Sequence, residues 1–266
     1  MTDTAALLAA YDTQLRAAET SHLPPGARAE VDGPVVRVVG QRPRGFVTGP
    51  PDLGVDGPAL DALIARQRDF FAARGEAVEW KTRGHDRPAD LPRRLVAAGF
   101  VAEQRETVLV GEAERLAEAP LSPPEGVTVR EAVSASDMER IAETVSEVWA
   151  EDRSWLAAEL TDRVVRNGDG RTVVVVAEAA GRVVSSARLE FEPGTDFAGL
   201  WGGSTLAAWR GRGIYRALVT YRARLAVARK TRYLQVDATE DSRPILERMG
   251  FVAVTTTTPY VWTPPR

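Results

Sequence analysis

Residues 205–218 read T-L-A-A-W-R-G-R-G-I-Y-R-A-L and join an apolar run to a helical pattern. The glycines and arginines of this stretch are Arg210, Gly211, Arg212, Gly213 and Arg216. Glycine weakens helices and strands alike, so two glycines here indicate that bare backbone is needed. The first turn of a helix carries unpartnered N–H groups and a partial positive charge. With the arginines, this junction predicts a binding site for phosphate or pyrophosphate.

The charge pattern around the junction supports an anion site. The segment 197–236 contains no Asp or Glu, whereas the whole chain has a formal net charge of −3. Its basic residues are Arg210, Arg212, Arg216, Arg222, Arg224, Arg229, Lys230 and Arg232. We assign the three junction arginines to ligand binding. We expect Arg222, Arg224, Arg229 and Arg232 only to solvate a helix face.

Two common phosphate-binding loops do not fit this junction. It is not Gly-x-x-x-x-Gly-Lys-[Ser/Thr], which disfavours a nucleoside triphosphatase. It is not Gly-x-Gly-x-x-Gly either, because Arg216 stands at the last position, and no acidic residue follows about 20 positions later to hold a ribose. A nicotinamide cofactor is therefore not expected.

A repeat divides the chain into two copies of one α/β unit. The pattern Leu-x-x-x-Gly-Phe-Val-Ala occurs at 95–102 and again at 246–253. A longer helical pattern, a short strand and a polar loop with Arg-Pro precede it in both places. Proline-rich residues 120–124 mark the seam. We therefore predict one domain over 1–121 and a second over 122–266.

The second copy predicts a mixed sheet flanked by helices. Apolar and β-branched runs between turn signals indicate its strands, and helical periodicity indicates its helices. The expected strands are 127–131, 172–179, 182–191, 197–206, 232–237 and 251–262. The expected helices are 136–149, 214–229 and 242–248, with an irregular, partly helical stretch to about 166.

Composition excludes several classes of protein. The chain has 266 residues, 44% hydrophobic residues and no cysteine, so disulfides, thiolate metal sites and a cysteine nucleophile are excluded. The slight acidity argues against a general nucleic-acid binder. No apolar run reaches the length of a membrane span, and the N-terminus is unlike a secretory leader. We expect a cytoplasmic protein with no metal, no nucleic-acid partner and no membrane partner.

The junction resembles the acyl-CoA loop of the GNAT superfamily of N-acetyltransferases. That family has the pattern [Arg/Gln]-x-x-Gly-x-[Gly/Ala], which Arg210 to Tyr215 fits except for Tyr215 itself. A second resemblance is the strand, helix and Gly-Phe order from Val236 to Phe251. The likeness covers roughly 127–262. It implies an α/β (α+β) fold of two GNAT-like domains, each a mixed, mostly antiparallel sheet flanked by helices.

The resemblance also implies acetyl-CoA as cosubstrate. The backbone of the last strand residues before the junction would bind the pantetheine arm, and the junction would bind the diphosphate. The implied cofactor-binding residues are Ser204, Thr205, Leu206, Arg210, Gly211, Arg212, Gly213, Ile214, Tyr215 and Arg216.

Acetyl transfer to an amine needs a base and an acid. The candidates for the base are Asp196, which we favour, and Glu190. Many GNAT members use a tyrosine as acid in the helix before Gly-Phe, but Leu246 stands at that position here. Ser242, Tyr215 or a water could replace it. Without cysteine, direct transfer in a ternary complex is expected.

Aromatic residues suggest where the amine acceptor binds. Trp149, Asp152 and Trp155 fall in the stretch that builds the acceptor wall in GNAT folds, and a cationic amine suits aromatic faces beside a carboxylate. Trp201 precedes two glycines inside a strand, which indicates a bulge or a close ligand approach. Core packing of these tryptophans is the alternative. The expected partner is a small-molecule amine, and a homodimer is compatible with the sequence.

The first copy carries aspartates where the second has arginines. Its segment 50–57 reads P-P-D-L-G-V-D-G, and its negative charge would repel a pyrophosphate. We predict a degenerate GNAT-like domain that binds no CoA. Three alternatives stay open for the whole chain: a non-catalytic acyl-CoA-binding sensor, a tandem transferase resembling mycothiol synthase, and a generic nucleotide-binding module.

Overall fold

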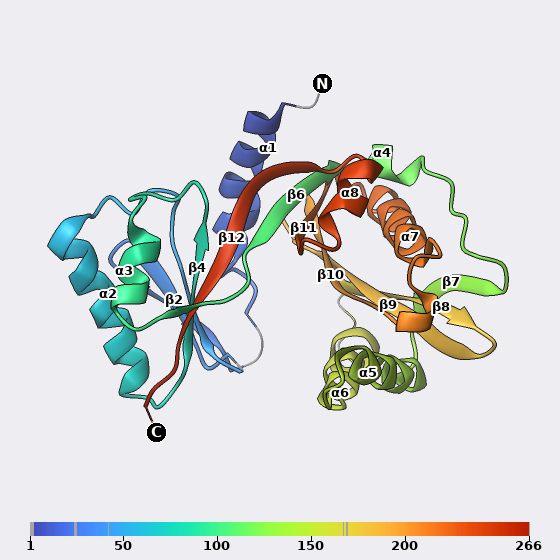
Figure 1. The fold of residues 1–266 in the computed structure, drawn as a ribbon, viewed down its shortest axis with the longest axis horizontal. Helices are drawn as coiled ribbons and strands as arrows, with labels where there is room; N and C mark the ends of the chain where they lie inside the picture. The colour runs from blue at the N-terminus through green and yellow to red at the C-terminus, as the bar shows by residue number, and fades with distance from the viewer. Residues whose placement is uncertain (1–2, 24–25, 42, 167, 169, 266) are drawn as a thin grey trace. The chain divides into compact units, whose positions relative to one another are not determined.

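The computed structural model describes residues 3–23, 26–41, 43–166, 168 and 170–265 (Figure 1). The chain forms two compact units. The first comprises Met1–Leu109, Asp237–Arg243 and Ala253–Arg266, and the second comprises Val110–Val236 and Pro244–Val252. The chain passes from the first unit to the second within β6 (Glu106–Glu112).

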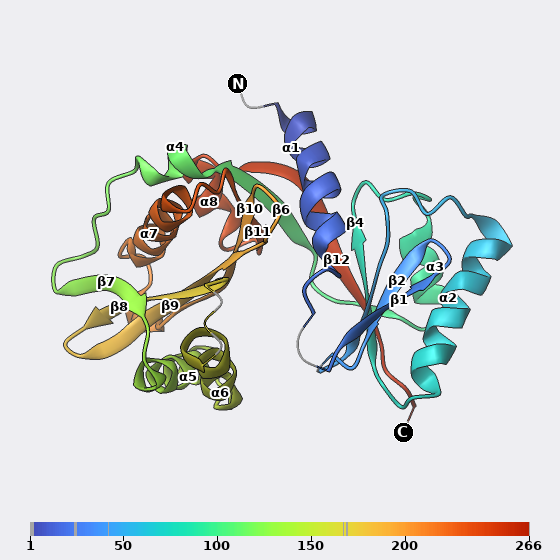
Figure 2. The same ribbon diagram turned by 180° about the vertical axis from the view of Figure 1, so that it is seen from behind.

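The first unit is a sheet with helices on both faces. Its strands are β1 (Arg28–Asp32), β2 (Val35–Val39), β3 (Gly45–Thr48), β4 (Val78–Arg83) and β12 (Val252–Trp262), in that order, with β5 (Val101–Ala102) paired to β12. Among the described strand pairs within this unit, only β3–β4 is parallel. Helices α2 (Gly57–Ala72) and α3 (Leu91–Ala97) cover one face (Figure 1). Helix α1 (Thr4–Ala10) and the π-helical turn η1 (Tyr11–Arg16) lie on the other, as the reverse view confirms (Figure 2).

The second unit has the same kind of layering. Strands β7 (Val127–Ala132), β8 (Thr172–Ala179), β9 (Arg182–Phe191) and β10 (Phe197–Thr205) form an antiparallel series, and β11 (Tyr233–Ala238) pairs parallel with β10. Helices α5 (Ala135–Trp149) and α6 (Trp155–Leu160), followed by the turn η2 (Thr161–Arg166), lie on one face. Helix α7 (Ile214–Ala228) lies on the other (Figure 1). The remaining helices are α4 (Ala113–Ala117) and α8 (Arg243–Met249).

Sequence patterns explain the core of the second unit. Strand β8 contains four consecutive valines that are all buried, as expected for a strand covered on both faces. Helix α5 begins with a capping box, in which Ser134 accepts from the Asp137 N–H and Asp137 accepts from the Ser134 N–H. Its buried side chains Met138 and Ile141 pack with Val174 and Val176 of β8. The sheet and α5 therefore share one core.

The predicted domain seam at 121/122 differs from the observed division. Residues 110–121 group with the second unit, and the last residues of the chain group with the first. The reason is β12: its residues Thr257–Trp262 pair antiparallel with Arg83–Val78 of β4. Prolines mark a change of structure in the sequence, but they do not reveal which strands pair.

Within the described part of the chain, no helix is long and apolar enough to cross a membrane.

Candidate functional site

Strand β10 is irregular where the glycines follow Trp201. Its register with β9 shifts between Trp201 and Ser204, and Gly202 has a φ of +60°. An added Cβ on Gly199 would lie 2.3 Å from Trp201 Nε1, so the indole folds back over Gly199 and would have to shift for any larger residue there. The bulge predicted from these glycines is present, and Trp201 is 39% exposed beside it.

Strands β10 and β11 pair only near the start of β10. Their ladder joins Phe197 to Tyr233, Ala198 to Leu234 and Gly199 to Gln235. Beyond Gly199, β10 continues to Thr205 with no further β11 partner among the described residues. Backbone groups on that side of β10 are thus placed to bind an extended ligand, such as a pantetheine arm, as an added strand.

The predicted backbone contacts at the end of β10 need one correction. The Leu206 N–H already donates to Val184 O at 3.0 Å, and Leu206 is buried. It faces β9 and is not available to a ligand. The Ser204 carbonyl accepts from Ser185 Oγ at 2.8 Å, whereas the Thr205 carbonyl accepts from Arg210 Nε at 3.0 Å. The backbone N–H and C=O groups of successive strand residues point to opposite sides of the strand. Because the Leu206 N–H points to β9, those of Thr205 point away from β9.

The junction after β10 exposes backbone as expected. A short 3₁₀ turn, η3 (Ala207–Trp209), leads to Gly211 and Gly213, with φ of +73° and +87°. Apart from the chain neighbours of each glycine, no atom of the described residues lies within 4 Å of a Cβ built on Gly211 or Gly213. Gly213 is the N-cap of α7, and no side chain caps the helix. The first N–H groups of α7 thus have no side-chain cap, and the helix dipole favours an anion at this end.

The junction arginines add full positive charge. Arg210, Arg212 and Arg216 are exposed, and no described carboxylate forms an ion pair with any of them. The Arg210 bond to Thr205 O holds its side chain along the junction, and the Arg212 guanidinium lies 4.9 Å from the Trp209 ring centroid. Arginines that no carboxylate neutralises, beside uncapped N–H groups, suit a diphosphate.

One arginine of α7 was interpreted wrongly from the sequence. Arg222 is 1% exposed and does not solvate a helix face. It donates to Leu218 O at 3.0 Å and to Arg188 O at 2.8 Å, so its guanidinium links α7 to β9. Burial lowers the pKa of Arg222 to about 10. The run of basic residues in the sequence does not reveal that Arg222 is buried, because helical spacing alone does not fix which face of α7 contacts the sheet.

Tyr215 occupies the position where the GNAT pattern has a small residue. Its ring lies against the bulge, since a Cβ on Gly203 would be 3.3 Å from Tyr215 Cε2. Burial raises the pKa of the Tyr215 phenol, and the Arg222 charge opposes this change. The side chain thus points towards β10 rather than across the mouth of the junction.

The two predicted bases lie in different places. Glu190 is the register partner of Gly199, two residues before Trp201. Asp196 precedes the first residue of β10, five residues before Trp201, which is about 16 Å along a strand. Its carbonyl accepts from the N–H groups of Arg232 and Tyr233. Asp196 therefore does not lie at the bulge, and Glu190 replaces it as the favoured base.

Of the two predicted acids, Tyr215 lies against the bulge, whereas Ser242 stays a prediction. Leu246 is fully buried in the second unit and carries no hydroxyl. Ser242 belongs to the first unit, where its Oγ lies 3.3 Å from Thr239 Oγ1 and from the Thr239 carbonyl oxygen.

The predicted acceptor residues are partly brought together. Trp149 is 58% exposed and donates from Nε1 to Ser204 Oγ at 3.2 Å, which fixes the end of α5 against β10. Trp155 is exposed at the start of α6. Asp152 accepts from the Ser154 N–H at 2.9 Å, a bond that lowers its pKa. Trp149 and Trp201 therefore lie beside β10, while Asp152 is used in the turn that leads to α6.

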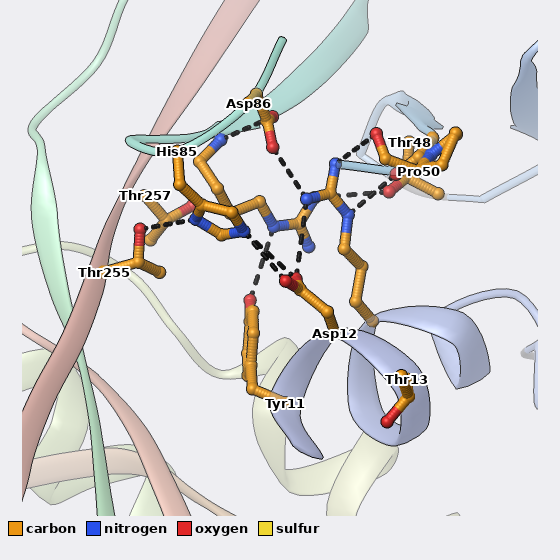
Figure 3. A network of polar contacts seen from close by, with 12 residues as sticks. Tyr11, Asp12, Thr13, Thr48, Pro50, His85, Asp86, Thr255 and Thr257 are labelled. Carbon is orange, nitrogen blue, oxygen red and sulfur yellow. Dashed lines mark hydrogen bonds and ion pairs between the residues drawn. The ribbon is translucent and has the colours of Figure 1, made fainter. Parts of the chain in front are cut away.

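The matching junction of the first unit is filled by its own side chains (Figure 3). The β3–β4 ladder ends at Val47 and Trp80. Buried Arg16, from η1, donates to Gly49 O at 2.7 Å and to Pro50 O at 3.0 Å, the first residues after β3. The predicted absence of CoA from this unit stays a prediction, which this filling supports.

Further polar contacts tie the N-terminal helix to the same place. Arg16 also bonds Asp86 at 2.7 Å. Arg83 of β4 donates to Tyr11 Oη and Thr48 Oγ1, each at 3.3 Å, and also contacts Glu19. His85 joins Asp12 and Thr255, at 3.0 and 2.8 Å (Figure 3).

Sequence reasoning missed Arg188 and the network around Arg16. Arg188 follows a run of apolar and small residues, V-V-S-S-A, on a strand with buried neighbours, and that change of residue type is a usable signal. Nothing in the sequence near Arg16 distinguishes it from an ordinary surface residue of a helix.

Comparisons with known proteins returned a family match and several similar structures. Residues 135–251 match the family model for the Acetyltransferase (GNAT) family. A GCN5-related N-acetyltransferase from Kribbella flavida is 18% identical, with a TM-score of 0.71 over 100% of this chain and 97% of its own. A tandem GNAT protein from the clavulanic acid biosynthesis pathway is 14% identical, with a TM-score of 0.66 over 94% of this chain and 87% of its own. A GCN5-related N-acetyltransferase from Sphaerobacter thermophilus is 16% identical, with a TM-score of 0.65 over 88% of this chain and 82% of its own.

These likenesses confirm the predicted fold class, a mixed and mostly antiparallel α/β fold flanked by helices. No curated protein matches the sequence significantly.

Proposed function

We propose that this chain, whose residues 135–251 match the family model of the Acetyltransferase (GNAT) family, is an N-acetyltransferase for a small-molecule primary amine. Acetyl transfer from acetyl-CoA is the general reaction of the family. The single observation that carries the proposal is the uncapped start of α7 beside three exposed arginines without ion pairs to described carboxylates.

We assign the residues that would hold acetyl-CoA as follows. The N–H groups of Ile214, Tyr215 and Arg216 and the guanidinium groups of Arg210 and Arg212 would bind its diphosphate. The edge of β10 beyond Gly199, with Thr205 on it, would bind the pantetheine arm. Bound there, the cosubstrate supplies an acetyl group activated as a thioester.

The amine must lose a proton before it can attack. Glu190 lies beside the bulge on β9, and it is the carboxylate that we assign to remove this proton, directly or through water. With no cysteine in the chain, the acetyl group passes straight to the amine while both substrates are bound. One N–C bond forms, the C–S bond breaks, and a proton returns to the thiolate. Tyr215, whose buried phenol lies at the bulge, is our candidate donor.

The cofactor assignment is tested by measuring CoA affinity calorimetrically. Replacing Arg210 and Arg212 together by Ala should weaken binding by about 1–3 kcal/mol for each lost charge-assisted contact, which is roughly 5- to 150-fold per contact. The matched control is Arg166→Ala, an exposed arginine whose pair with Asp162 lies elsewhere in the second unit. Equal affinity in the double variant and the control would move the cofactor site elsewhere.

The base is tested by following free thiol release with a panel of amines. Glu190→Gln should lower kcat by roughly 10²- to 10⁴-fold at neutral pH while CoA affinity stays unchanged. The rate should recover partly at alkaline pH, where the amine is already neutral. A wild-type rate at neutral pH would remove Glu190 from the mechanism.

A second candidate function is an acyl-CoA-binding sensor without catalysis. Leu246, which stands where many members have a tyrosine acid, favours it. Tight acetyl-CoA binding with no thiol release for any amine would support the sensor and reject the transferase.

A further inference from the structure

A charged cluster lies on the sheet beside the bulge. Arg188 and Glu190 are two residues apart on β9, so their side chains lie on the same face of the sheet. Their register partners on β10 are Trp201 and Gly199, respectively. Arg163 reaches the same carboxylate from η2, with its Nη1 3.3 Å from Glu190 Oε1. The cluster thus sits beside the Trp201 indole, on the face that carries α6 and η2.

Arg188 is held at the bulge but is poorly satisfied there. Its guanidinium lies against Gly202, where an added Cβ would be 3.5 Å from Arg188 Cζ. Its Nε is buried and has no hydrogen-bond acceptor among the described residues, although Glu190 Oε1 is 3.3 Å away. Arg222 fixes the backbone of Arg188 from the opposite face through the bond to its carbonyl. A buried donor without an acceptor is costly, so it indicates a group that arrives with a ligand.

The charges of the cluster do not suit a simple amine. Two arginines contact Glu190, and the other carboxylate that Arg163 contacts is Glu159, at 3.4 Å. An ammonium that approaches Glu190 would therefore meet the positive charge of Arg188 at close range. A ligand with an anionic group next to its ammonium would remove this repulsion and give Arg188 an acceptor.

We infer that the acceptor is a zwitterion with a carboxylate beside its amine, as in a free α-amino acid, and that Arg188 binds the carboxylate while Glu190 faces the ammonium. This inference rests on the proposed function, because it names the substrate class of the same site. Arg188 is then a binding residue that selects the acceptor, and the exposed Trp201 forms a wall of the site.

The test compares three amino acids (alanine, phenylalanine and glutamate) with their α-carboxamides. The wild-type protein, Arg188→Gln and the control Arg182→Gln are assayed by thiol release at saturating acetyl-CoA. Arg182 lies on the same strand, where it pairs with Glu147 on an exposed surface. At least one free acid should have a KM about ten-fold or more below that of its amide. Arg188→Gln should abolish that preference without changing CoA affinity, and Arg182→Gln should retain it.

The outcomes separate the inference from the proposed function. The inference is overturned if every carboxamide has the same KM as its free acid, or if Arg188→Gln still prefers the acid. Either result is compatible with the proposed transferase activity. If no amine is acetylated, the quenching of tryptophan fluorescence by the same six compounds is titrated in the presence of CoA. Saturable binding of an acid that is lost in Arg188→Gln then supports the inference, whereas absence of acid-selective binding overturns it.

Discussion

Replacing Arg222 by Met should leave the stability of the protein unchanged or raise it, although this side chain makes two hydrogen bonds. Arg222 is 1% exposed, and burial lowers its pKa to about 10 from an ordinary value of 12.5. Each pKa unit corresponds to about 1.4 kcal/mol, so burying the charged Arg222 side chain costs the folded state roughly 3 kcal/mol at neutral pH, relative to the unfolded chain. No described carboxylate forms an ion pair with it to offset this cost.

The loss on substitution is smaller than this cost. Leu218 O is the acceptor expected for the Arg222 N–H within the helix, so it keeps a partner. Arg188 O loses the guanidinium, and a buried carbonyl without a donor costs about 1–3 kcal/mol. Methionine is long, unbranched and adaptable, so it fills most of the same volume. The expected change in the free energy of unfolding is therefore between zero and about 2 kcal/mol in favour of Arg222→Met.

Urea denaturation followed by circular dichroism measures this change, and Arg222→Ala is the matched control. Alanine removes the charge but leaves a cavity, so it should destabilise the protein by about 2–5 kcal/mol. The advantage of Arg222→Met should also shrink as the pH rises towards and above 10. The unfolded wild-type chain holds the Arg222 proton more tightly than the folded one, so wild-type stability gains with pH there. A loss of more than about 2 kcal/mol in Arg222→Met at pH 7 would refute this reasoning.

Two further substitutions test the start of α5 and the bulge. Asp137→Asn should cost about 1–3 kcal/mol at pH 7, because hydrogen bonds from Arg130 and from Ser134 hold the pKa of Asp137 well below its ordinary value. A carboxylate with a lowered pKa stabilises the fold above about pH 4 and loses this effect as the pH falls. Urea titrations at pH 7, 5 and 3 should therefore show that the difference in unfolding free energy between wild type and Asp137→Asn becomes smaller at low pH. A difference that stays constant would contradict the ion pair. Gly199→Ala should displace the Trp201 indole, since the new Cβ would lie 2.3 Å from its Nε1. Tryptophan emission should move to longer wavelength and acceptor affinity should fall with CoA affinity intact; an unchanged spectrum would show that the indole does not lie over Gly199.

The second unit was largely predictable because its sequence patterns are local. The predicted strand 182–191 and the helix 136–149 agree with β9 and α5 within one residue at each end. Valine-rich runs between turns and a strong helical period determine such elements. The junction at Arg210 was also predictable, because glycine and arginine there serve backbone exposure and charge rather than packing.

The parts that could not be predicted depend on contacts between distant residues. Arg222 belongs to a basic run, and only the packing of α7 against β9 shows that it is buried. Asp196 fits a family spacing, but the length of a strand carries it away from the bulge. Arg16 contacts residues that are 33 and 70 positions away in the chain, and no local pattern records such partners.

The order in which the ribosome makes this chain has a consequence for the first unit. β4 gains its β12 neighbour only from Ala253–Arg266, which are synthesised after the second unit. At about 5–20 residues per second, making the intervening second unit takes on the order of ten seconds. During that time the nascent β4 has one open edge, which can pair with other chains. A truncation that removes β12 would therefore damage the first unit, although the rest of that unit is translated before the second.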